Sequence, residues 1–339
     1  MSLDTFFDRY LPLIEAEMRA TVQNDQLCHT EMFKMLRYHL GWIDAECAPC
    51  QSQAGKRIRP VLCLLTCEAC GGNWEQALPA GAAIELVHNF SLIHDDIQDR
   101  DTTRRGRPTV WALWGDAQGI NAGNALFALA QLTLLHSVER DVPATRVVAA
   151  MRLLNQTCVD LTVGQHLDIS FEDRTDVSSA DYLTMIEGKT AALVACACEM
   201  GGLIAAAPPS QRDLLRSFGR HLGLAFQMRD DILGIWGDSS VTGKPVGADI
   251  SRRKKSLPIL HGLETSPPLR HLFAQETLSQ EDVHRATALL QETGSRAYTE
   301  HLEREHHDQA TTALEQAALH SPAAEALREL VDRLLGRER

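Results

Sequence analysis

Apolar residues recur at helical spacing along almost the whole chain, and this periodicity is the feature that most restricts the fold. Long segments with an apolar stripe are separated by short breaks such as Gly71-Gly72 and Pro208-Pro209. Sustained alternation of apolar and polar residues, which marks half-buried strands, is nearly absent. The pattern therefore predicts helices of about 12 to 25 residues that pack as a bundle.

No low-complexity linker divides the 339 residues, so we expect one all-α domain over residues 1–339. Residues 275–339 are rich in Glu, Gln, His and Arg but keep apolar stripes, which predicts amphipathic outer helices. The most apolar stretch, residues 190–207, contains Glu199 and two glycines. This interruption favours a closely packed buried helix over a membrane span.

The overall charge restricts the function. The chain has 45 acidic and 33 basic residues and a formal net charge of −12 at pH 7. This balance argues against a nucleic-acid partner, because a general nucleic-acid binder needs a basic surface. The amino-terminal segment lacks the basic and apolar regions of a secretory signal, so we expect a cytoplasmic protein without a membrane span.

Nine cysteines are scattered mostly within apolar runs, which is typical of reduced intracellular thiols. Sixteen residues separate the pair Cys47 and Cys50 from the pair Cys67 and Cys70, a spacing that also matches a zinc ribbon. However, Cys63, Cys67 and Cys70 recur as one stripe of a helix. The first pair also lacks the glycine of a zinc knuckle. We therefore favour buried structural thiols over a zinc site.

An aspartate-rich motif, DDIQD at residues 95–99, ends an apolar segment that we expect to be helical. On a helix, Asp95 and Asp99 lie one turn apart, with Cβ atoms separated by about 5–6 Å, and His88 falls on the same face. Like charges at this spacing destabilise a helix. Two such carboxylates suit Mg²⁺, which prefers oxygen ligands, whereas the alternative is a solvated helix end.

A second aspartate pair, Asp230-Asp231, lies in another apolar segment, on the same helical stripe as Gln227 and Gly234. Two such helices that face each other across a cavity could share several Mg²⁺ ions. Mg²⁺ takes only one or two carboxylates and completes its shell with water and phosphate oxygens. The two motifs therefore predict a di- or triphosphate ligand.

Basic residues, several of them beside a glycine, lie near both motifs. They form five groups: Lys56 to Arg59, Arg104-Arg105, Lys189 with Thr190, Lys244, and Arg252 to Lys255. A glycine beside a lysine lets the backbone approach a phosphate while the ammonium supplies charge. Each group alone is typical of a solvated surface, but their combination with the paired aspartates favours diphosphate binding.

These motifs together resemble those of the trans-isoprenyl diphosphate synthases, the polyprenyl synthetase family of head-to-tail prenyltransferases. Five motifs occur in the family order between residues 54 and 258. The resemblance implies an isoprenoid synthase fold, in which a single all-α bundle of many helices surrounds a deep central cavity. It also implies a homodimer.

The resemblance further implies roles for individual residues. The Mg²⁺ ligands would be the aspartates of the two motifs: Asp95, Asp96, Asp99, Asp230 and Asp231. About three ions would be bound per active site together with diphosphate. The isopentenyl diphosphate pocket would contain Lys56, Arg59, His88 and Arg105. The allylic diphosphate and the reacting carbons would be contacted by Arg104, Lys189, Thr190, Gln227, Lys244 and Lys254. The catalytic set would be Asp95, Asp99, Lys189, Thr190, Gln227 and Asp230. Gln165 and Asp168 match a further family element.

The implied reaction is a Mg²⁺-dependent condensation of isopentenyl diphosphate with dimethylallyl, geranyl or farnesyl diphosphate. Cations would neutralise the leaving diphosphate, and no side-chain nucleophile is required. The second motif departs from the family pattern because Gly234 replaces its last carboxylate. A class I terpene cyclase and a non-catalytic subunit of a heteromeric synthase are the alternatives. The retained Lys56, Arg59 and Arg105 disfavour the cyclase, which lacks an isopentenyl pocket.

Product length depends on two residues before the first motif, Phe90 and Ser91, where the family has its size gate. On a helix, Ser91 lies about 40° around the axis and roughly 6 Å along it from Asp95, beneath the growing chain. A small Ser91 argues against a short-chain stop, and a bulky Phe90 argues against very long products. We expect the C20 product, geranylgeranyl diphosphate, with C15 farnesyl diphosphate as the alternative.

Overall fold

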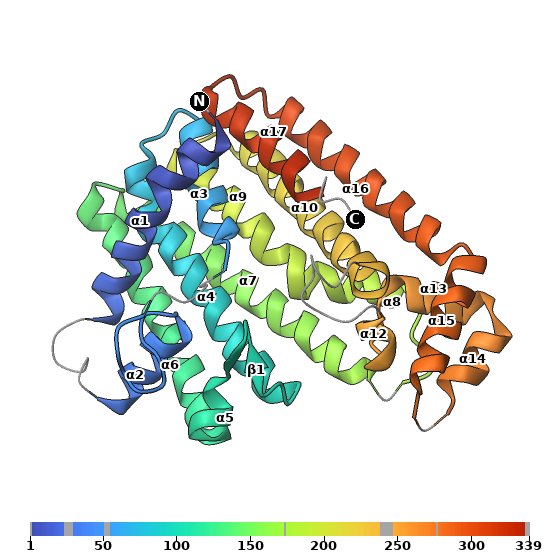
Figure 1. Cartoon of the computed structure of the whole chain (residues 1–339). Helices are drawn as coiled ribbons and strands as arrows, with labels where there is room; N and C mark the ends of the chain where they lie inside the picture. Colours follow the sequence, from blue (N-terminus) through green and yellow to red (C-terminus); the bar gives the residue numbers. More distant parts are fainter. Residues whose placement is uncertain are drawn as a thin grey trace. The chain divides into compact units, whose positions relative to one another are not determined.

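The computed structural model of the chain is built almost entirely from helices (Figure 1). It describes residues 2–23, 30–50, 55–172, 174–237, 247–275 and 277–335. The first helices are α1 (Leu3–Val22), α2 (Glu31–His39), α3 (Ile58–Ala69), a 3₁₀ turn η1 (Trp74–Ala77) and α4 (Leu78–Gln98). The next are α5 (Val110–Trp114), α6 (Asp116–Leu135), a 3₁₀ turn η2 (His136–Arg140) and α7 (Ala144–Phe171). The predicted all-α class is confirmed.

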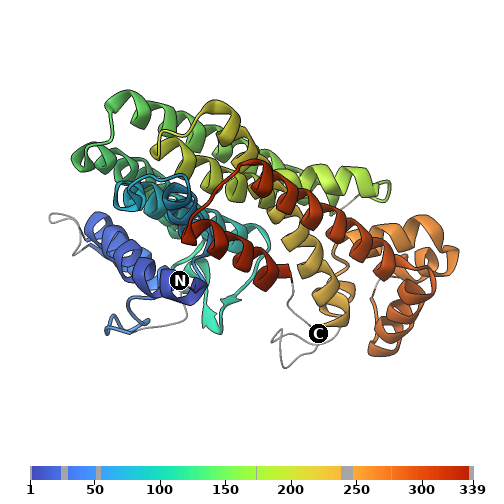
Figure 2. The same cartoon turned by 90° about the horizontal axis from the view of Figure 1, so that it is seen from above.

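The second half of the chain contains the remaining helices. They are α8 (Ser179–Ile186), the π-helical segment η3 (Glu187–Ala191), α9 (Ala192–Ile204), α10 (Pro209–Trp236) and α12 (Ala248–Ser251), followed by α13 (Leu257–Thr265), α14 (Pro267–Phe273), α15 (Gln280–Glu292), α16 (Ser295–Gln316) and α17 (Pro322–Leu335). Both α7 and α10 have 28 residues, which is longer than the periodicity predicted. The short helices α13, α14 and α15 lie together, as two views show (Figure 1 and Figure 2).

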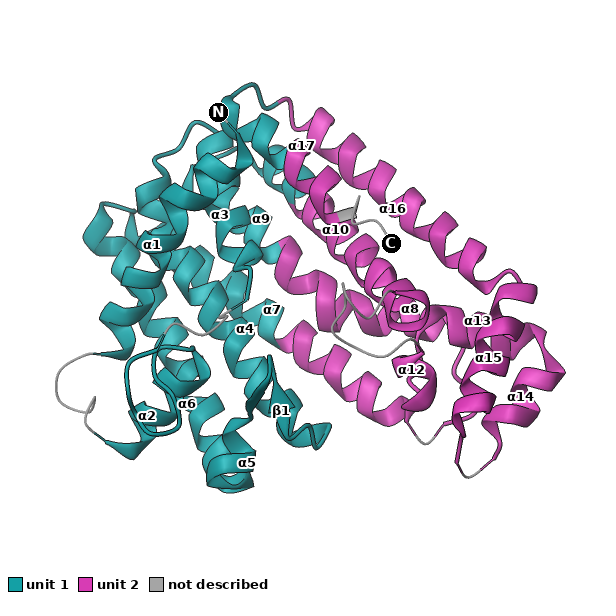
Figure 3. Cartoon of the chain, viewed as in Figure 1, with its two compact units in different colours: residues 1–158, 196–215, 319–327 teal, residues 159–195, 216–318, 328–339 magenta. Residues whose placement is uncertain are grey.

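The chain folds into two compact units (Figure 3). Unit 1 contains residues 1–158, 196–215 and 319–327, and unit 2 contains residues 159–195, 216–318 and 328–339. Four of the five boundaries fall inside helices, and the fifth lies between α16 and α17. The single domain expected over residues 1–339 stays a prediction.

Among the described residues, strands are confined to one short hairpin, β1 (Thr103–Arg104) and β2 (Arg107–Pro108). The two residues between them, Arg105 and Gly106, have φ angles of +52° and +74°. Positive φ at both central positions is the type I′ geometry that fits the twist of a two-residue hairpin. The hairpin belongs to unit 1 and was not expected from the sequence.

The thiols expected to be structural lie mainly in the core of unit 1. Cys63 and Cys67 of α3 and Cys196 and Cys198 of α9 are buried, and Cys70 is half-buried at the end of α3. Burial raises the pKa of Cys67 to about 12 and that of Cys196 to about 12. The predicted burial of Cys63 and Cys67 is confirmed, and none of the helices in the described ranges combines the length and apolar content needed to cross a membrane.

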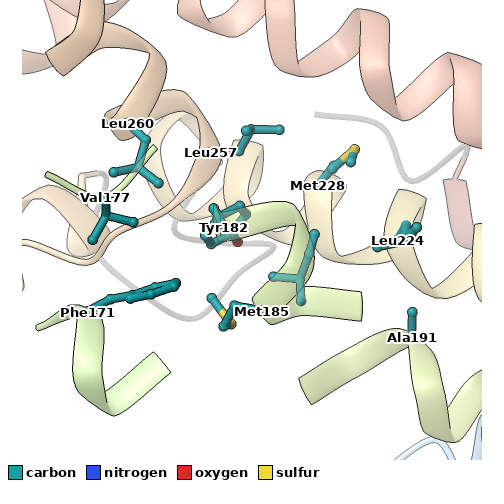
Figure 4. Packing of buried hydrophobic residues seen from close by; sticks show 10 residues of the cluster. Phe171, Val177, Tyr182, Met185, Ala191, Leu224, Met228, Leu257 and Leu260 are labelled. Carbon is teal, nitrogen blue, oxygen red and sulfur yellow. The ribbon is translucent and has the colours of Figure 1, made fainter. Parts of the chain in front are cut away.

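An apolar cluster in unit 2 joins α7, α8, α10 and α13 (Figure 4). Its largest side chains are Phe171, Tyr182, Met185, Met228 and Leu260. The start of α8 is fixed by a capping box, in which the Ser178 side chain and the Asp181 side chain each bond the other's backbone N–H. This cap sets the rotation of α8 and so points Tyr182 into the cluster toward α10.

Candidate active site

A basic loop precedes α3 in unit 1 and is held by a buried arginine. Arg57 has a φ of +46°, and its guanidinium lies 2.7 Å from Glu15 of α1 and 3.4 Å from Glu85 of α4. A positive φ is costly for a residue with a side chain, so the two ion pairs hold the loop in this conformation. The sequence placed Arg57 in a basic group but did not reveal this role.

Two contacts bring the expected isopentenyl pocket residues together around this loop. A Cβ atom on Gly55 would lie 2.6 Å from Nη2 of Arg105, so only glycine lets Arg105 cover the residue before Lys56. Nη1 of Arg59 lies 3.5 Å from Nε2 of His88. Arg59 and His88 therefore lie side by side, and Arg105 covers the residue before Lys56, all within unit 1.

This group of residues has a surplus of positive charge. Burial lowers the pKa of His88 well below its usual value, and Arg59 and Arg105 lower it further. Burial together with Arg104 and Arg105 lowers the pKa of His39 to about 3. Both imidazoles are therefore neutral at physiological pH. The neighbouring guanidiniums keep their charge and form a site suited to an anion such as a diphosphate.

The first aspartate motif lies at the end of α4 and contacts Arg104 of the hairpin. Nε of Arg104 donates to Asp96 Oδ1 at 2.6 Å, and Nη2 donates to Asp95 Oδ2 at 3.1 Å. Asp96 is only 1% exposed, and its burial raises its pKa to about 6 despite Arg104. Asp99 is exposed, and its N–H bonds the Asp95 carbonyl at 2.8 Å, which places the two carboxylates on successive turns.

Asp96 was expected among the Mg²⁺ ligands, but its position gives it another task. Its buried carboxylate anchors Arg104, while Asp95 is half-buried and Asp99 reaches solvent. Asp95 and Asp96 both reach the guanidinium of Arg104, but Asp96 is buried whereas Asp95 and Asp99 are not. Asp95 and Asp99 therefore form the candidate ligand face of this motif.

The two residues expected to set product length are half-buried on α4. The ring of Phe90 packs edge-on against Phe127 of α6, with centroids 5.3 Å apart, and against His94 at 5.7 Å. The Ser91 hydroxyl donates to the His88 carbonyl at 2.8 Å, so this small side chain is folded against its own helix. Phe90 is thus held by α6, and Ser91 adds little bulk beneath Asp95.

In unit 2, Lys189 and Thr190 lie in the π-helical segment η3, a geometry that is frequent at functional sites. Lys189 Nζ pairs with Asp168 of α7, and the Thr190 hydroxyl donates to Gln227 Oε1 of α10 at 2.9 Å. A Cβ atom on Gly164 would overlap the backbone N of Lys189, so glycine allows α7 to pack directly on this segment. Four expected residues, Asp168, Lys189, Thr190 and Gln227, are therefore brought together, and Gln165 is half-buried one turn before Asp168.

Asp231 is a buried centre of hydrogen bonds and is 0% exposed. Its Oδ2 accepts from the Tyr182 hydroxyl at 2.5 Å and from the Leu257 N–H at 3.2 Å, and its Oδ1 accepts from Gln227 Nε2 at 3.0 Å. Desolvation raises the pKa of Asp231, although these bonds oppose the rise. Asp230, by contrast, is exposed. Both were expected to bind Mg²⁺; the oxygens of Asp231 already accept hydrogen bonds within the protein, whereas Asp230 is open to solvent.

A carboxylate fills the place next to the glycine of the second motif. A Cβ atom on Gly234 would overlap Oδ2 of Asp249, which is buried on α12. Partial desolvation disfavours the charge of the nearby Lys254, but Asp231, Asp249 and Asp168 together raise its pKa. Sequence reasoning missed Asp249 because its contact with Gly234 is a tertiary one. The only signal in the sequence was an acidic residue soon after the second motif.

The donor atoms of this chain fit Mg²⁺ by their chemistry. Asp95, Asp99 and Asp230 offer hard carboxylate oxygens on side chains that solvent reaches. Within the ranges that the structure describes, no three His, Cys, Asp or Glu side chains form a ready metal cluster. A Mg²⁺ site built from one or two carboxylates and completed by phosphate needs no such cluster. Lys244, which was also expected at the site, lies outside the described residues.

Comparison with known proteins is consistent across sequence and structure. The family model described as polyprenyl synthetase matches residues 41–290. A geranylgeranyl diphosphate synthase of Mycobacterium tuberculosis H37Rv is 43% identical over 304 residues, which cover 88% of this chain and 85% of that protein. A (2E,6E)-farnesyl diphosphate synthase of the same organism is 41% identical over 315 residues, covering 91% and 86%. The crystal structure of a polyprenyl synthetase from Streptomyces coelicolor A3(2) has a TM-score of 0.90 at 36% identity, covering 98% of this chain and 100% of that one.

Proposed function

We propose that this chain, which belongs to the polyprenyl synthetase family and is a short-chain prenyltransferase, makes geranylgeranyl diphosphate. Its substrates would be isopentenyl diphosphate and an allylic diphosphate. The observation that carries the proposal is the group of Arg59 and Arg105 around His88, with Lys56 beside it in the sequence, which supplies cations in addition to Arg104 at the neighbouring aspartate motif. A cyclase has one diphosphate to bind, whereas a condensing enzyme has two.

Each half of the site would bind one part of the reaction. The cationic group of unit 1 would hold the isopentenyl diphosphate, because the negative charge of this substrate balances the surplus positive charge of the group. Asp95, Asp99 and Asp230 would hold Mg²⁺, which supplies charge neutralisation for the leaving diphosphate. Arg104 in unit 1 and Lys189 in unit 2 would each be able to bind diphosphate oxygens once released from their carboxylate partners.

The reaction then needs no nucleophile from the protein. The C–O bond of the allylic diphosphate breaks, the double bond of isopentenyl diphosphate attacks the allylic cation, and a proton leaves to the departing diphosphate. Thr190 and Gln227, which are bonded to each other at 2.9 Å, would present oxygen dipoles to the cation. Gln227 is in turn oriented by Asp231.

The C20 product is supported by the walls of α4. Phe90 is fixed against Phe127, and Ser91 is small and bonded to its own helix. A growing prenyl chain would therefore pass Ser91 and stop at the aromatic ring of Phe90. Farnesyl diphosphate is the second candidate, because the relatives include synthases of both products.

Product analysis with C5, C10 and C15 allylic starters tests the proposal. We expect release of diphosphate only when isopentenyl diphosphate is present, with C20 as the final product from every starter. Accumulation of C15 would assign the chain as a farnesyl diphosphate synthase. Diphosphate release without isopentenyl diphosphate would indicate a cyclase, and a chain inert with every starter would indicate a non-catalytic subunit. Ser91→Phe should shorten the products, whereas the matched Ser91→Ala should leave them at C20.

We further propose that the enzyme is a homodimer. In unit 1, α6, η2 and the first part of α7 expose large apolar side chains: Ile120 46%, Leu132 53%, Leu135 42%, Val138 48% and Val148 66%. Soluble monomers rarely expose a large contiguous apolar patch, and covering by a second copy would bury it. Analytical ultracentrifugation should show a dimer that Leu132→Glu weakens; a wild-type chain that stays monomeric at high concentration would contradict the proposal.

A further inference from the structure

A ligand-sized pocket lies in unit 2, apart from the residues assigned to catalysis. Its volume is about 600 Å³, which falls within the roughly 300–1,000 Å³ typical of sites for small organic ligands. Its walls are formed by the loop that follows α7, by α13 and by the end of α14. The apolar part of the lining consists of Val177, Ile259, Leu260, Leu263 and Phe273.

The rim of this pocket is basic. Arg270 donates to the Leu263 carbonyl at 2.7 Å, and Arg253 donates to the Phe273 carbonyl at 3.3 Å. Because these acceptors are neutral carbonyls, neither guanidinium loses its net charge. The third cation is Lys255, whose pKa is lowered by desolvation. In the part of the chain that the structure describes, none of the three pairs with a carboxylate.

Two of the acidic side chains of the lining are already engaged. Asp176 accepts two hydrogen bonds from Arg174, at 2.9 and 3.1 Å. Glu264 Oε1 accepts from the N–H and the hydroxyl of Ser179, at 2.9 and 3.1 Å. The third, Glu172, is exposed. The pocket thus combines an apolar wall with cations that are not neutralised, which is the complement of an amphipathic anion.

The pocket is connected to the catalytic residues of the same unit. Arg253 and Lys255 line it, whereas Lys254 between them interacts with Asp231 and Asp249. On the apolar side, Val177 and Leu260 of the wall belong to the cluster that contains Tyr182 and Leu257, as Figure 4 shows. Tyr182 and Leu257 both donate to Asp231. A ligand here would press on the segments that position Asp231 and Lys254.

We propose that this pocket is a second binding site for a prenyl diphosphate, the enzyme's own class of product, and that its occupancy slows the reaction. The isoprenoid chain would lie against Leu260, Leu263 and Phe273, and the diphosphate would meet Lys255 and the two arginines. The choice of geranylgeranyl diphosphate as the ligand rests on the proposed function. The binding of a prenyl diphosphate to this pocket does not depend on which chain length the enzyme makes.

Equilibrium dialysis with labelled geranylgeranyl diphosphate tests the site directly. With Mg²⁺ we expect two molecules bound per chain, at the aspartates and in the pocket. With EDTA and saturating isopentenyl diphosphate, which occupies the cationic group of unit 1, we expect one, because the pocket binds through cations of the protein and needs no metal. Ala274→Trp, which fills the pocket from an exposed lining residue, should abolish the EDTA-resistant binding and keep the Mg²⁺-dependent binding. Lys255→Gln should weaken the EDTA-resistant binding about tenfold.

A matched control and a kinetic readout complete the test. Ala180→Trp, on an exposed alanine of α8 outside the lining, should leave both binding events unchanged. Added product should inhibit the wild type in a way that excess allylic substrate does not relieve. Ala274→Trp should remove this inhibition without changing the initial rate.

The inference is overturned if EDTA abolishes all binding, if binding in EDTA survives Ala274→Trp, or if geranylgeraniol binds as well as its diphosphate. EDTA-resistant binding by a chain that is inert with every starter would overturn the proposed function and support the pocket.

Discussion

The two units hold their charges in opposite ways. In unit 1, burial and nearby arginines lower pKa values. The pKa values of His88 and His39 fall through burial and the adjacent guanidiniums. The pKa of Arg105 also falls, because burial, Arg104 and Arg57 outweigh the opposing effect of Glu85. In unit 2, partial desolvation disfavours the charge of Lys254, but three carboxylates raise its pKa. The first region is a positive site built around neutral imidazoles, and the second is a negative site built around one buried carboxylate.

Under the proposed function, this difference would let an acidic protein bind two anionic substrates in different ways. A surplus of guanidinium charge would bind a diphosphate directly, which suits the substrate that keeps its diphosphate during the reaction. A surplus of carboxylate would bind an anion only through a cation, which suits the substrate whose diphosphate must leave. The net charge of −12 describes neither site, because the charges are sorted by position.

The largest expected effect comes from removing a carboxylate of the ligand face. Asp95→Asn should lower kcat/KM by about 10²–10³-fold, as expected for losing one preorganised electrostatic group. Its stability should hold or rise, because the repulsion between Asp95 and Asp99 is relieved. Steady-state kinetics at several Mg²⁺ concentrations and urea unfolding measure both. Asp116→Asn, an exposed acid paired with Arg100 in the same unit, is the control and should retain full activity. An Asp95→Asn enzyme with wild-type rate would remove the metal role.

The buried carboxylate of unit 2 should respond differently. Tyr182→Phe removes a hydroxyl that donates to Asp231 at 2.5 Å, and it should cost about 1.5–3 kcal/mol of unfolding free energy, as for other hydrogen bonds to charged groups. Activity should fall with stability, because Asp231 orients Gln227. Tyr298→Phe is the matched control, since Tyr298 makes its contact through its ring, which stacks on His261 at 4.3 Å. A Tyr182→Phe variant that lost activity but kept its unfolding free energy would contradict the stabilising role of this hydrogen bond.

The contact between Gly234 and Asp249 gives a smaller effect. Gly234→Ala places a methyl group against Asp249 Oδ2 and should cost about 1–3 kcal/mol, as overpacking does. In the double variant Gly234→Ala/Asp249→Ala the crowding disappears, so the two changes should be non-additive by at least about 0.5 kcal/mol. Urea unfolding of the two single variants and the double variant measures the coupling. Strict additivity would mean that Asp249 moves away freely.

The helices and the ligand face of the first motif could be predicted because both depend on local periodicity. The separation of Asp95 from Asp99 by one turn follows from 3.6 residues per turn, and so does the conclusion that Asp96 faces elsewhere. That second conclusion was available from the sequence, yet both members of each aspartate pair were expected to bind Mg²⁺. Helical geometry alone would have separated an exposed member of each pair from a buried one.

Other features depend on contacts that no local pattern contains. The hairpin at Arg105-Gly106 is too short for any periodicity to show. The close approach of Gly164 to the segment with Lys189, and of Gly234 to Asp249, joins residues far apart in the chain. A glycine in such a sequence shows only that a side chain is absent, and the structure is needed to say what lies against it.

The pH dependence of unfolding gives the smallest effect and tests the positive site itself. His39 has a pKa of about 3 in the folded chain, against about 6.5 when unfolded. Below pH 6.5 the unfolded chain binds a proton that the folded chain does not, so this group makes stability fall as pH falls, by up to about 1.4 kcal/mol per pH unit. His39→Gln should remove that contribution, and the exposed His271→Gln should not. Unfolding free energies between pH 5 and 7 measure the difference. Isopentenyl diphosphate should reduce the difference between the wild type and His39→Gln, because an anion beside Arg105 offsets the positive charge that keeps His39 neutral. An unchanged difference would mean that burial alone sets this pKa and that the arginines contribute nothing to it.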